Sequence, residues 1–115
     1  MSGTITPTEL SKMLEEKRDV VIFDVRQRAD CEADGETIPG AVWRDPEQVD
    51  LWSKDLPGEK EVVVYCVRGG SVSKSVATRL LDENVDVRYI EGGLSAWKES
   101  GGEVKQRNQI ERSFI

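Results

Sequence analysis

The most informative part of the sequence lies between residues 61 and 72, which read Glu61-Val62-Val63-Val64-Tyr65-Cys66-Val67-Arg68-Gly69-Gly70-Ser71-Val72. The first half is β-branched and apolar, as in a buried strand. Two glycines interrupt the run, and apolar residues then recur at helical spacing, at Val72, Val76, Ala77, Leu80 and Leu81. This stretch therefore predicts a strand over 61–65, a glycine loop and a helix over about 72–83.

The alternation of strand and helix continues on both sides of this stretch. Thr6-Pro7-Thr8-Glu9 combines an N-cap threonine, a proline at the first helical position and a capping-box glutamate, and Leu10, Met13 and Leu14 follow at helical spacing. Val20 to Asp24 is an apolar run bounded by charge, which is typical of a buried strand. Residues 87–90 predict a last strand and residues 94–98 a last helix. The pattern favours an α/β fold, a mainly parallel sheet with helices on both faces.

Weaker signals lie between these elements. Residues 27–34 are polar and predict a short helix or a loop. Ile38-Pro39-Gly40 predicts a turn, and residues 41–43 a short strand. Asp45-Pro46-Glu47-Gln48 predicts a helix start with Leu51 and Trp52 on its apolar face, and Pro57-Gly58 breaks the chain. We expect Trp43, Trp52 and Trp97 in the core.

Length and composition indicate one domain of ordinary solubility. The 115 residues suit a single unit, expected over 1–103, with a polar C-terminal tail over 104–115 in which Phe114-Ile115 is able to dock back. The net charge of -6 disfavours nucleic acid and anionic membrane surfaces as partners. No apolar run approaches the roughly 20 residues of a membrane span. Because residues 1–7 lack the basic and apolar regions of a signal peptide, we expect a cytoplasmic protein.

The sequence contains no histidine, which excludes Ser-His and Cys-His dyads and histidine-ligated metals. Its two cysteines cannot build a disulfide framework and lack the spacing of a zinc site. A nucleophile in this chain must therefore be activated by charge, a helix dipole or backbone amides, and we expect neither a metal nor an organic cofactor.

Cys66 is the candidate nucleophile. It follows a predicted parallel strand at the end where ligands bind, and it precedes a helix N-terminus, where free N–H groups favour anions. Gly69 and Gly70 let the backbone amides converge on an anion, and Arg68 adds a positive charge, so together they favour a thiolate. Taken singly, each residue has a plainer interpretation: a small buried apolar group, a tight turn or a solvated cation. Their combination at one junction favours a thiolate that handles anions.

Four stretches resemble the rhodanese family, in its single-domain form. They keep the family's order and spacing over about residues 4–101, and they are Phe23-Asp24-Val25-Arg26, Gly35-Glu36-Thr37-Ile38-Pro39-Gly40-Ala41, Cys66-Val67-Arg68-Gly69-Gly70-Ser71 and Gly92-Gly93-Leu94-Ser95-Ala96-Trp97. The resemblance implies a sheet of about five strands and a loop that holds a persulfide sulfur. Thr37 stands where the family has a histidine, a change that we expect to affect local packing.

The resemblance also implies the roles of the loop residues. Cys66 would accept sulfur, the amides of residues 67–71 would cradle it, Arg68 would contact the substrate, and Ser71 would close the loop with a hydroxyl able to reach sulfur. The implied substrate-binding set is Val67, Arg68, Gly69, Gly70, Ser71 and Val72. The implied activity moves a sulfane sulfur from thiosulfate or another donor to cyanide, a thiol or a protein acceptor.

Two other functions stay open. Phosphatases and arsenate reductases of this fold carry an arginine six residues after the cysteine, but here that position is Val72. A sulfur carrier or binding module without turnover is the second alternative.

Two residue sets outside the loop have structural interpretations. Asp24 and Arg26 are expected to tie a strand end to neighbouring loops through an ion pair. Cys31 has acidic neighbours at 30, 32, 34 and 36, so we interpret it as incidental, with a resolving cysteine for Cys66 as the alternative.

Overall fold

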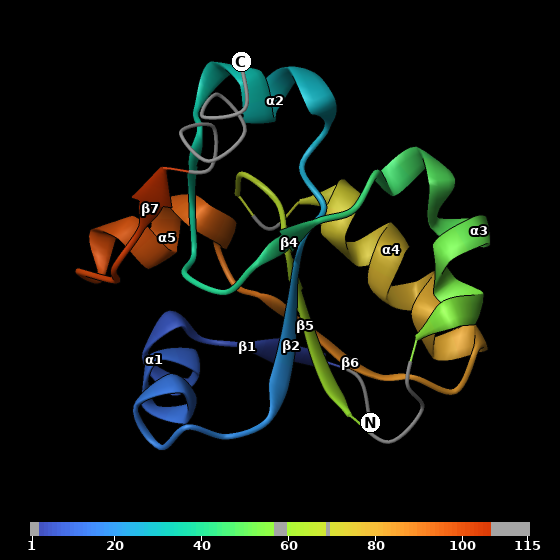
Figure 1. The fold of residues 1–115 in the computed structure, drawn as a ribbon, viewed down its shortest axis with the longest axis horizontal. Helices are drawn as coiled ribbons and strands as arrows, with labels where there is room; N and C mark the ends of the chain where they lie inside the picture. Colours follow the sequence, from blue (N-terminus) through green and yellow to red (C-terminus); the bar gives the residue numbers. More distant parts are fainter. Residues whose placement is uncertain (1–2, 57–59, 69, 107–115) are drawn as a thin grey trace, which may run out of the picture.

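The computed structural model describes residues 3–56, 60–68 and 70–106, and a five-stranded sheet runs through its centre (Figure 1). The strand order is β1-β6-β5-β2-β4, and every neighbouring pair is parallel. The strands are β1 (Gly3–Ile5), β2 (Val20–Asp24), β4 (Val42–Trp43), β5 (Glu61–Tyr65) and β6 (Asp86–Ile90). This confirms the predicted α/β fold and its parallel sheet.

Helices cover both faces of this sheet, as predicted. Figure 1 shows α1 (Pro7–Glu15) and α5 (Gly93–Glu99) on one side, and α3 (Val49–Trp52) and α4 (Ser71–Asp82) on the other. The side chains of β5 alternate between the two layers: Val63 and Tyr65 join the core under α1 and α5, whereas Val62 and Val64 join the core under α3 and α4. Burial on both faces explains why β5 reads as a continuous apolar run.

The first helix begins as its sequence predicts. The hydroxyl of Thr6 accepts a hydrogen bond from the Glu9 amide at 3.1 Å, and the Glu9 carboxylate accepts one from the Thr6 amide at 2.9 Å. With Pro7 at the first helical position, this capping box satisfies amides that a helix start leaves unpaired. Leu10 and Met13 are buried, and they anchor α1 on the sheet.

The segment after β4 departs from the prediction. Asp45 does cap a turn, but Pro46–Gln48 forms a 3₁₀ turn, α3 is only four residues long, and Ser53–Asp55 is again 3₁₀. Trp52 is buried edge-on against Phe23. Leu51 is 68% exposed, so its expected place on an apolar face was wrong. In this four-residue helix Trp52 is buried and Val49 packs partly buried against the same core, while Leu51 points to solvent.

Besides β1, two further strands were not predicted from the sequence. β3 (Glu36–Thr37) and β7 (Lys105–Gln106) pair antiparallel in a small second sheet, and Val104 packs against the core. Residues 104–106 therefore lie against the domain. The rest of the expected tail, including Phe114-Ile115, falls outside the described residues, as does Pro57-Gly58.

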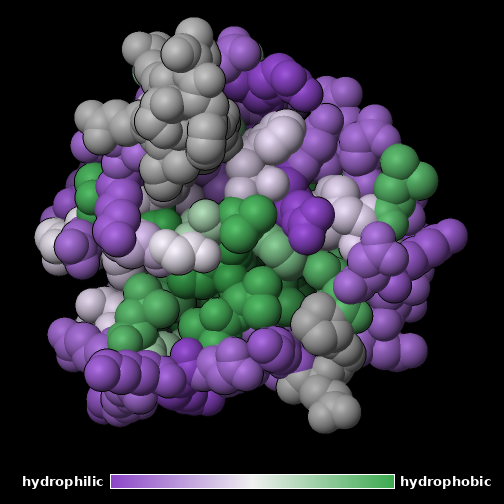
Figure 2. All heavy atoms as spheres, viewed as in Figure 1, coloured by the Kyte–Doolittle hydropathy of each residue, from purple (hydrophilic) through white to green (hydrophobic). Residues whose placement is uncertain are grey.

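The remaining helix, α2 (Arg28–Ala33), lies above the carboxyl ends of the strands (Figure 1). Figure 2 shows apolar side chains reaching the surface over β2 and β4, inside a hydrophilic border. None of the helices in the described part of the chain is both long and apolar enough to cross a bilayer.

Candidate functional site

Cys66 lies at the carboxyl end of the sheet, directly after β5, which is the third of the five strands. The start of α5 holds this point of the backbone in place. The Leu94 amide donates to the Cys66 carbonyl at 2.9 Å, and the Ser95 amide donates to the Val67 carbonyl at 3.0 Å. The predicted strand, loop and helix thus meet at the predicted cysteine.

The Cys66 thiol is nearly buried and contacts the first turn of α4. It is 7% exposed and is not in a disulfide. Its sulfur donates a hydrogen bond to the Ser73 hydroxyl at 3.4 Å, and that hydroxyl donates to the Gly70 carbonyl at 3.3 Å. The hydroxyl bonded to sulfur therefore belongs to Ser73, two residues beyond the Ser71 that the sequence suggested.

Ser73 is a residue in contact with the Cys66 sulfur that the sequence did not single out. The structure begins α4 at Ser71, so Ser73 is its third residue and its Oγ can reach the carbonyl three residues earlier. The signal was present in the sequence as a serine at this helical position. Finding it required the exact helix start, and boundaries are the least certain part of such predictions.

The other described residues of the predicted loop differ in their exposure. Val67 and Val72 are half-buried, while Arg68 and Ser71 are exposed. Gly70 is the N-cap of α4 with φ of -86°, and a Cβ there would meet no atom within 4 Å. Its backbone therefore does not need the left-handed freedom of glycine. Gly69 lies outside the described residues.

The start of α4 gives this loop its electrostatic character. The first amides of a helix have no helical acceptor and carry the positive end of the dipole. In α4 these amides belong to Ser71 and its neighbours, and Ser73 places the Cys66 sulfur against the same turn. Such a site favours an anion, whether a thiolate or a bound substrate.

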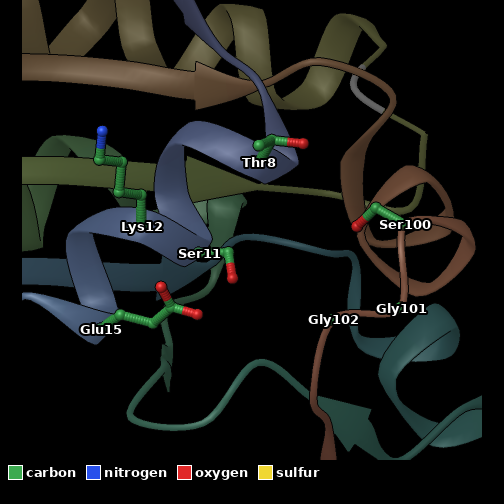
Figure 3. Close-up of a pocket in the computed structure, with 7 residues that line it drawn as sticks. All are labelled: Thr8, Ser11, Lys12, Glu15, Ser100, Gly101 and Gly102. Carbon is green, nitrogen blue, oxygen red and sulfur yellow. The ribbon is translucent and has the colours of Figure 1, made fainter.

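Two hollows flank the loop. One of about 250 Å³ lies against α4, and its lining comprises Gln27, Pro46, Glu47, Val49, Ser71, Val72, Ser75 and Val76. The other, of about 170 Å³, is lined by Arg26, Asp30, Ala33, Asp34, Val67, Leu94, Ser95 and Lys98. A hollow of about 390 Å³ between α1 and residues 100–102 shares no residue with the loop (Figure 3). Its size therefore says nothing about the Cys66 chemistry.

Asp24 and Arg26 form the buried ion pair that the sequence predicts. The guanidinium and carboxylate approach to 2.7 Å, and Arg26 also donates to the carbonyls of Asp34 and Glu36 at 2.9 and 3.1 Å. Burial alone would lower the pKa of Arg26, but the hydrogen bonds and charge of Asp24 outweigh it and raise that pKa. The pair is a structural tie between the end of β2 and the segment before β3.

Cys31 belongs to this ion pair's surroundings. It is 1% exposed, and its sulfur lies 4.0 Å from both carboxylate oxygens of Asp24. It is also not in a disulfide. Its buried position fits the incidental interpretation, and the resolving role stays an untested alternative.

Tyr65 is a further residue that the sequence did not single out. Its hydroxyl accepts a hydrogen bond from the Ile38 amide at 3.2 Å, which ties the end of β5 to the turn at 38–40. Burial, with the nearby charge of Asp24, raises the pKa of Tyr65, so the phenol stays neutral. Thr37, in place of the family's histidine, is buried beside this contact. Within residues 3–56, 60–68 and 70–106, no group of His, Cys, Asp or Glu side chains is arranged to hold a metal ion.

Comparison with known proteins agrees with this geometry. The family model described as "Rhodanese-like domain" matches residues 6–100. The thiosulfate sulfurtransferase GlpE of Coxiella burnetii is 37% identical over 86 residues, which cover 74% of this chain and 78% of that protein.

Solved structures share the fold. A rhodanese-like domain protein from Staphylococcus aureus superposes with a TM-score of 0.76 at 26% identity, covering 92% of this chain and 100% of its own. A Rhodopseudomonas palustris protein, described as of unknown function and a possible tyrosine phosphatase, superposes with a TM-score of 0.78 at 28% identity, covering 90% of this chain and 84% of its own.

Proposed function

Because the chain belongs to the rhodanese-like domain family, and so to a family of sulfurtransferases, we propose that it transfers the sulfane sulfur of thiosulfate through a persulfide on Cys66. One observation carries the proposal: a nearly buried thiol, outside any disulfide, lies at the carboxyl end of the central strand and contacts the first turn of α4. A relative of this size that is named a thiosulfate sulfurtransferase supports the same substrate.

The first half-reaction loads the enzyme. The Cys66 thiolate attacks the outer sulfur of thiosulfate, a new S–S bond forms to Cys66, and the S–S bond of thiosulfate breaks. Sulfite leaves with the bonding electron pair, and the negative charge of the thiolate passes to the outer sulfur of the persulfide. The first amides of α4 and the exposed Arg68 are the groups available to offset negative charge during this transfer.

The second half-reaction unloads it. A nucleophile such as cyanide or a thiolate attacks the outer sulfur, and the Cys66 thiolate leaves and is ready for another cycle. Every step uses the protein's own groups and the two substrates. We place this chemistry in the cytoplasm, where thiols stay reduced, because neither Cys31 nor Cys66 is in a disulfide.

Intact mass spectrometry tests the proposal. Incubation with thiosulfate should add the mass of one sulfur atom, and cyanide or a reductant should remove it. We expect Cys66→Ser to abolish both the adduct and thiosulfate:cyanide turnover. Cys31→Ser serves as the control and should keep both, because Cys31 packs against Asp24 and not against α4.

Each contrary outcome has its own meaning. Near-normal turnover in Cys66→Ser would refute the assignment, and an equal loss in Cys31→Ser would favour the resolving role. Sulfur that loads but never reaches cyanide or a thiol would indicate a carrier. Cys66-dependent hydrolysis of an aryl phosphate would indicate a phosphatase instead, an outcome that Val72 argues against because it occupies the position of the phosphatase arginine.

A further inference from the structure

The Ser73 hydroxyl lies between two groups that compete for its single proton. Its oxygen is 3.4 Å from the Cys66 sulfur and 3.3 Å from the Gly70 carbonyl oxygen. The side chain is fully buried at 0% exposure, so water does not compete for the hydroxyl. Among the residues that the structure describes, these two atoms are its hydrogen-bond partners.

The protonation state of Cys66 decides which partner receives the proton of Ser73. While Cys66 is a thiol, its S–H donates to Ser73, and Ser73 donates to Gly70, as observed. A thiolate has no proton to donate and becomes a strong acceptor, so rotation about the Cβ–Oγ bond redirects the hydroxyl toward sulfur. The proton lost by the thiol passes to solvent, and the Gly70 carbonyl gives up its hydrogen bond from Ser73.

We propose that Ser73 is a catalytic residue that stabilises the Cys66 thiolate by switching its hydroxyl from the Gly70 carbonyl to the sulfur. The switch links the state of the sulfur to the N-cap of α4, because Gly70 occupies that position. The effect of this switch on sulfur transfer rests on the proposed function. The effect of the switch on the stability of the Cys66 thiolate does not.

The two half-reactions use this hydrogen bond differently. Loading consumes the thiolate and moves the charge to the outer sulfur, so Ser73 returns to Gly70. Unloading regenerates the thiolate as the leaving group, which Ser73 stabilises as its charge develops. A thiolate that is more stable leaves faster but attacks more slowly once fully ionised, with a Brønsted coefficient of about 0.4–0.5.

Alkylation tests the hydroxyl without any sulfur transfer. Iodoacetamide modification of Cys66, resolved from Cys31 by peptide mapping, is followed against pH. In Ser73→Ala the pH of half-maximal reactivity should rise by about one unit, the effect of losing one hydrogen bond to a charged group. Ser75→Ala is the matched control, an exposed serine on the same helix, and should match the wild type. Alanine favours helix, so Ser73→Ala should fold.

Single-turnover kinetics supply a second test, because a general loss of structure would slow both half-reactions, whereas loss of the hydroxyl should slow only one. At a pH where Cys66 is ionised in both proteins, Ser73→Ala should load from thiosulfate no more slowly than the wild type. Its persulfide should unload to cyanide about threefold more slowly, because a one-unit change in the leaving thiol acts through that coefficient. Ser73→Thr keeps the hydroxyl and should restore both values, with its thermal melt checking that the added methyl is accommodated.

Two results would overturn the proposal. One is an unchanged alkylation profile in Ser73→Ala, and the other is an equal slowing of both half-reactions at high pH. If the alkylation profile shifts but thiosulfate adds no sulfur even to the wild type, the proposed function fails while the role of Ser73 stands.

Discussion

Arg26 and Arg68 are the same residue type with opposite surroundings, and burial separates their roles. Arg26 is 1% exposed and donates hydrogen bonds to the Asp24 carboxylate and to two backbone carbonyls. Arg68 is exposed at the rim of the Cys66 loop and forms no ion pair with any other described residue. A buried, paired arginine maintains the fold, whereas an exposed, unpaired one is available to an anionic substrate.

Replacing Arg68 should weaken thiosulfate use with little effect on folding. We expect Arg68→Ala to lower kcat/KM for thiosulfate by about 3- to 10-fold, mostly through KM, because a solvent-exposed charge is screened. Arg68→Lys should recover part of the loss, since it keeps the charge without the planar fork. Steady-state kinetics measure both.

Arg18→Ala is the matched control for charge. It changes the net charge by the same amount, but Arg18 pairs with Glu61 at the amino end of β5, about 16 Å of strand away from Cys66. If Arg18→Ala and Arg68→Ala lost equal activity, Arg68 would have no local role at the loop.

Single residues also show what the sequence can reveal about the site. Cys66 could be selected because its position after an apolar run and before two glycines places it at a strand-to-helix junction. Ser73 could not, because moving the helix start by one residue changes which hydroxyl faces the sulfur. The place of Gly69 in the predicted cradle stays a prediction, since it falls outside the described residues.

At the scale of elements, the start of α5 holds the backbone of the Cys66 loop in place through hydrogen bonds. Gly92 and Gly93 both have positive φ, at 74° and 59°, and this turn directs the next amides to the carbonyls of Cys66 and Val67. A Cβ on Gly92 would lie 2.5 Å from the Ala96 Cβ, closer than real contacts allow. The Gly-Gly motif that the sequence shares with the family is therefore a backbone requirement of the site.

Gly92→Ala should destabilise the protein and slow sulfur transfer together. A left-handed backbone costs a residue with a Cβ about 1–2 kcal/mol, and the Ala96 contact adds to this. Urea denaturation should show the loss, and Cys66 alkylation should show altered reactivity as the loop loses support from α5. Gly3→Ala is the control, since a Cβ there meets nothing within 4 Å and its φ is not positive. Equal stabilities would contradict this account of the turn.

The elements that the sequence predicts are determined by residues close together in the chain, whereas the elements that it misses depend on pairing between distant segments. The capping box of α1 and the valines of β5 act within a few residues, so the sequence reveals them. Strands β3 and β7 have two residues each and no measurable periodicity, and their partners are about 70 positions apart. β1 has three residues and gains its place by pairing with β6 near the other end of the chain. Such pairings depend on tertiary packing.

At the scale of the whole molecule, charge opposes the proposed substrate. The net charge of -6 repels a dianion such as thiosulfate. The positive groups that could attract it, the first amides of α4 and Arg68, follow β5 at the carboxyl end of the sheet. A local cation and helix amides must therefore offset a field set by the entire surface. Salt separates these contributions because it screens charges according to their distance.

Raising the ionic strength should therefore narrow the difference in kcat/KM for thiosulfate between the wild type and Arg68→Ala. As salt rises from about 0.01 M to about 1 M, the screening length falls from about 30 Å to about 3 Å. We expect kcat/KM of Arg68→Ala to rise, because salt screens the repulsion from the net charge, and that of the wild type to rise less, because the attraction of Arg68 is screened as well. Alkylation of Cys66 by neutral iodoacetamide at high pH controls for general salt effects. A difference that stayed constant across this range would show that Arg68 acts through packing or shape, and the substrate contact assigned to its charge would be wrong.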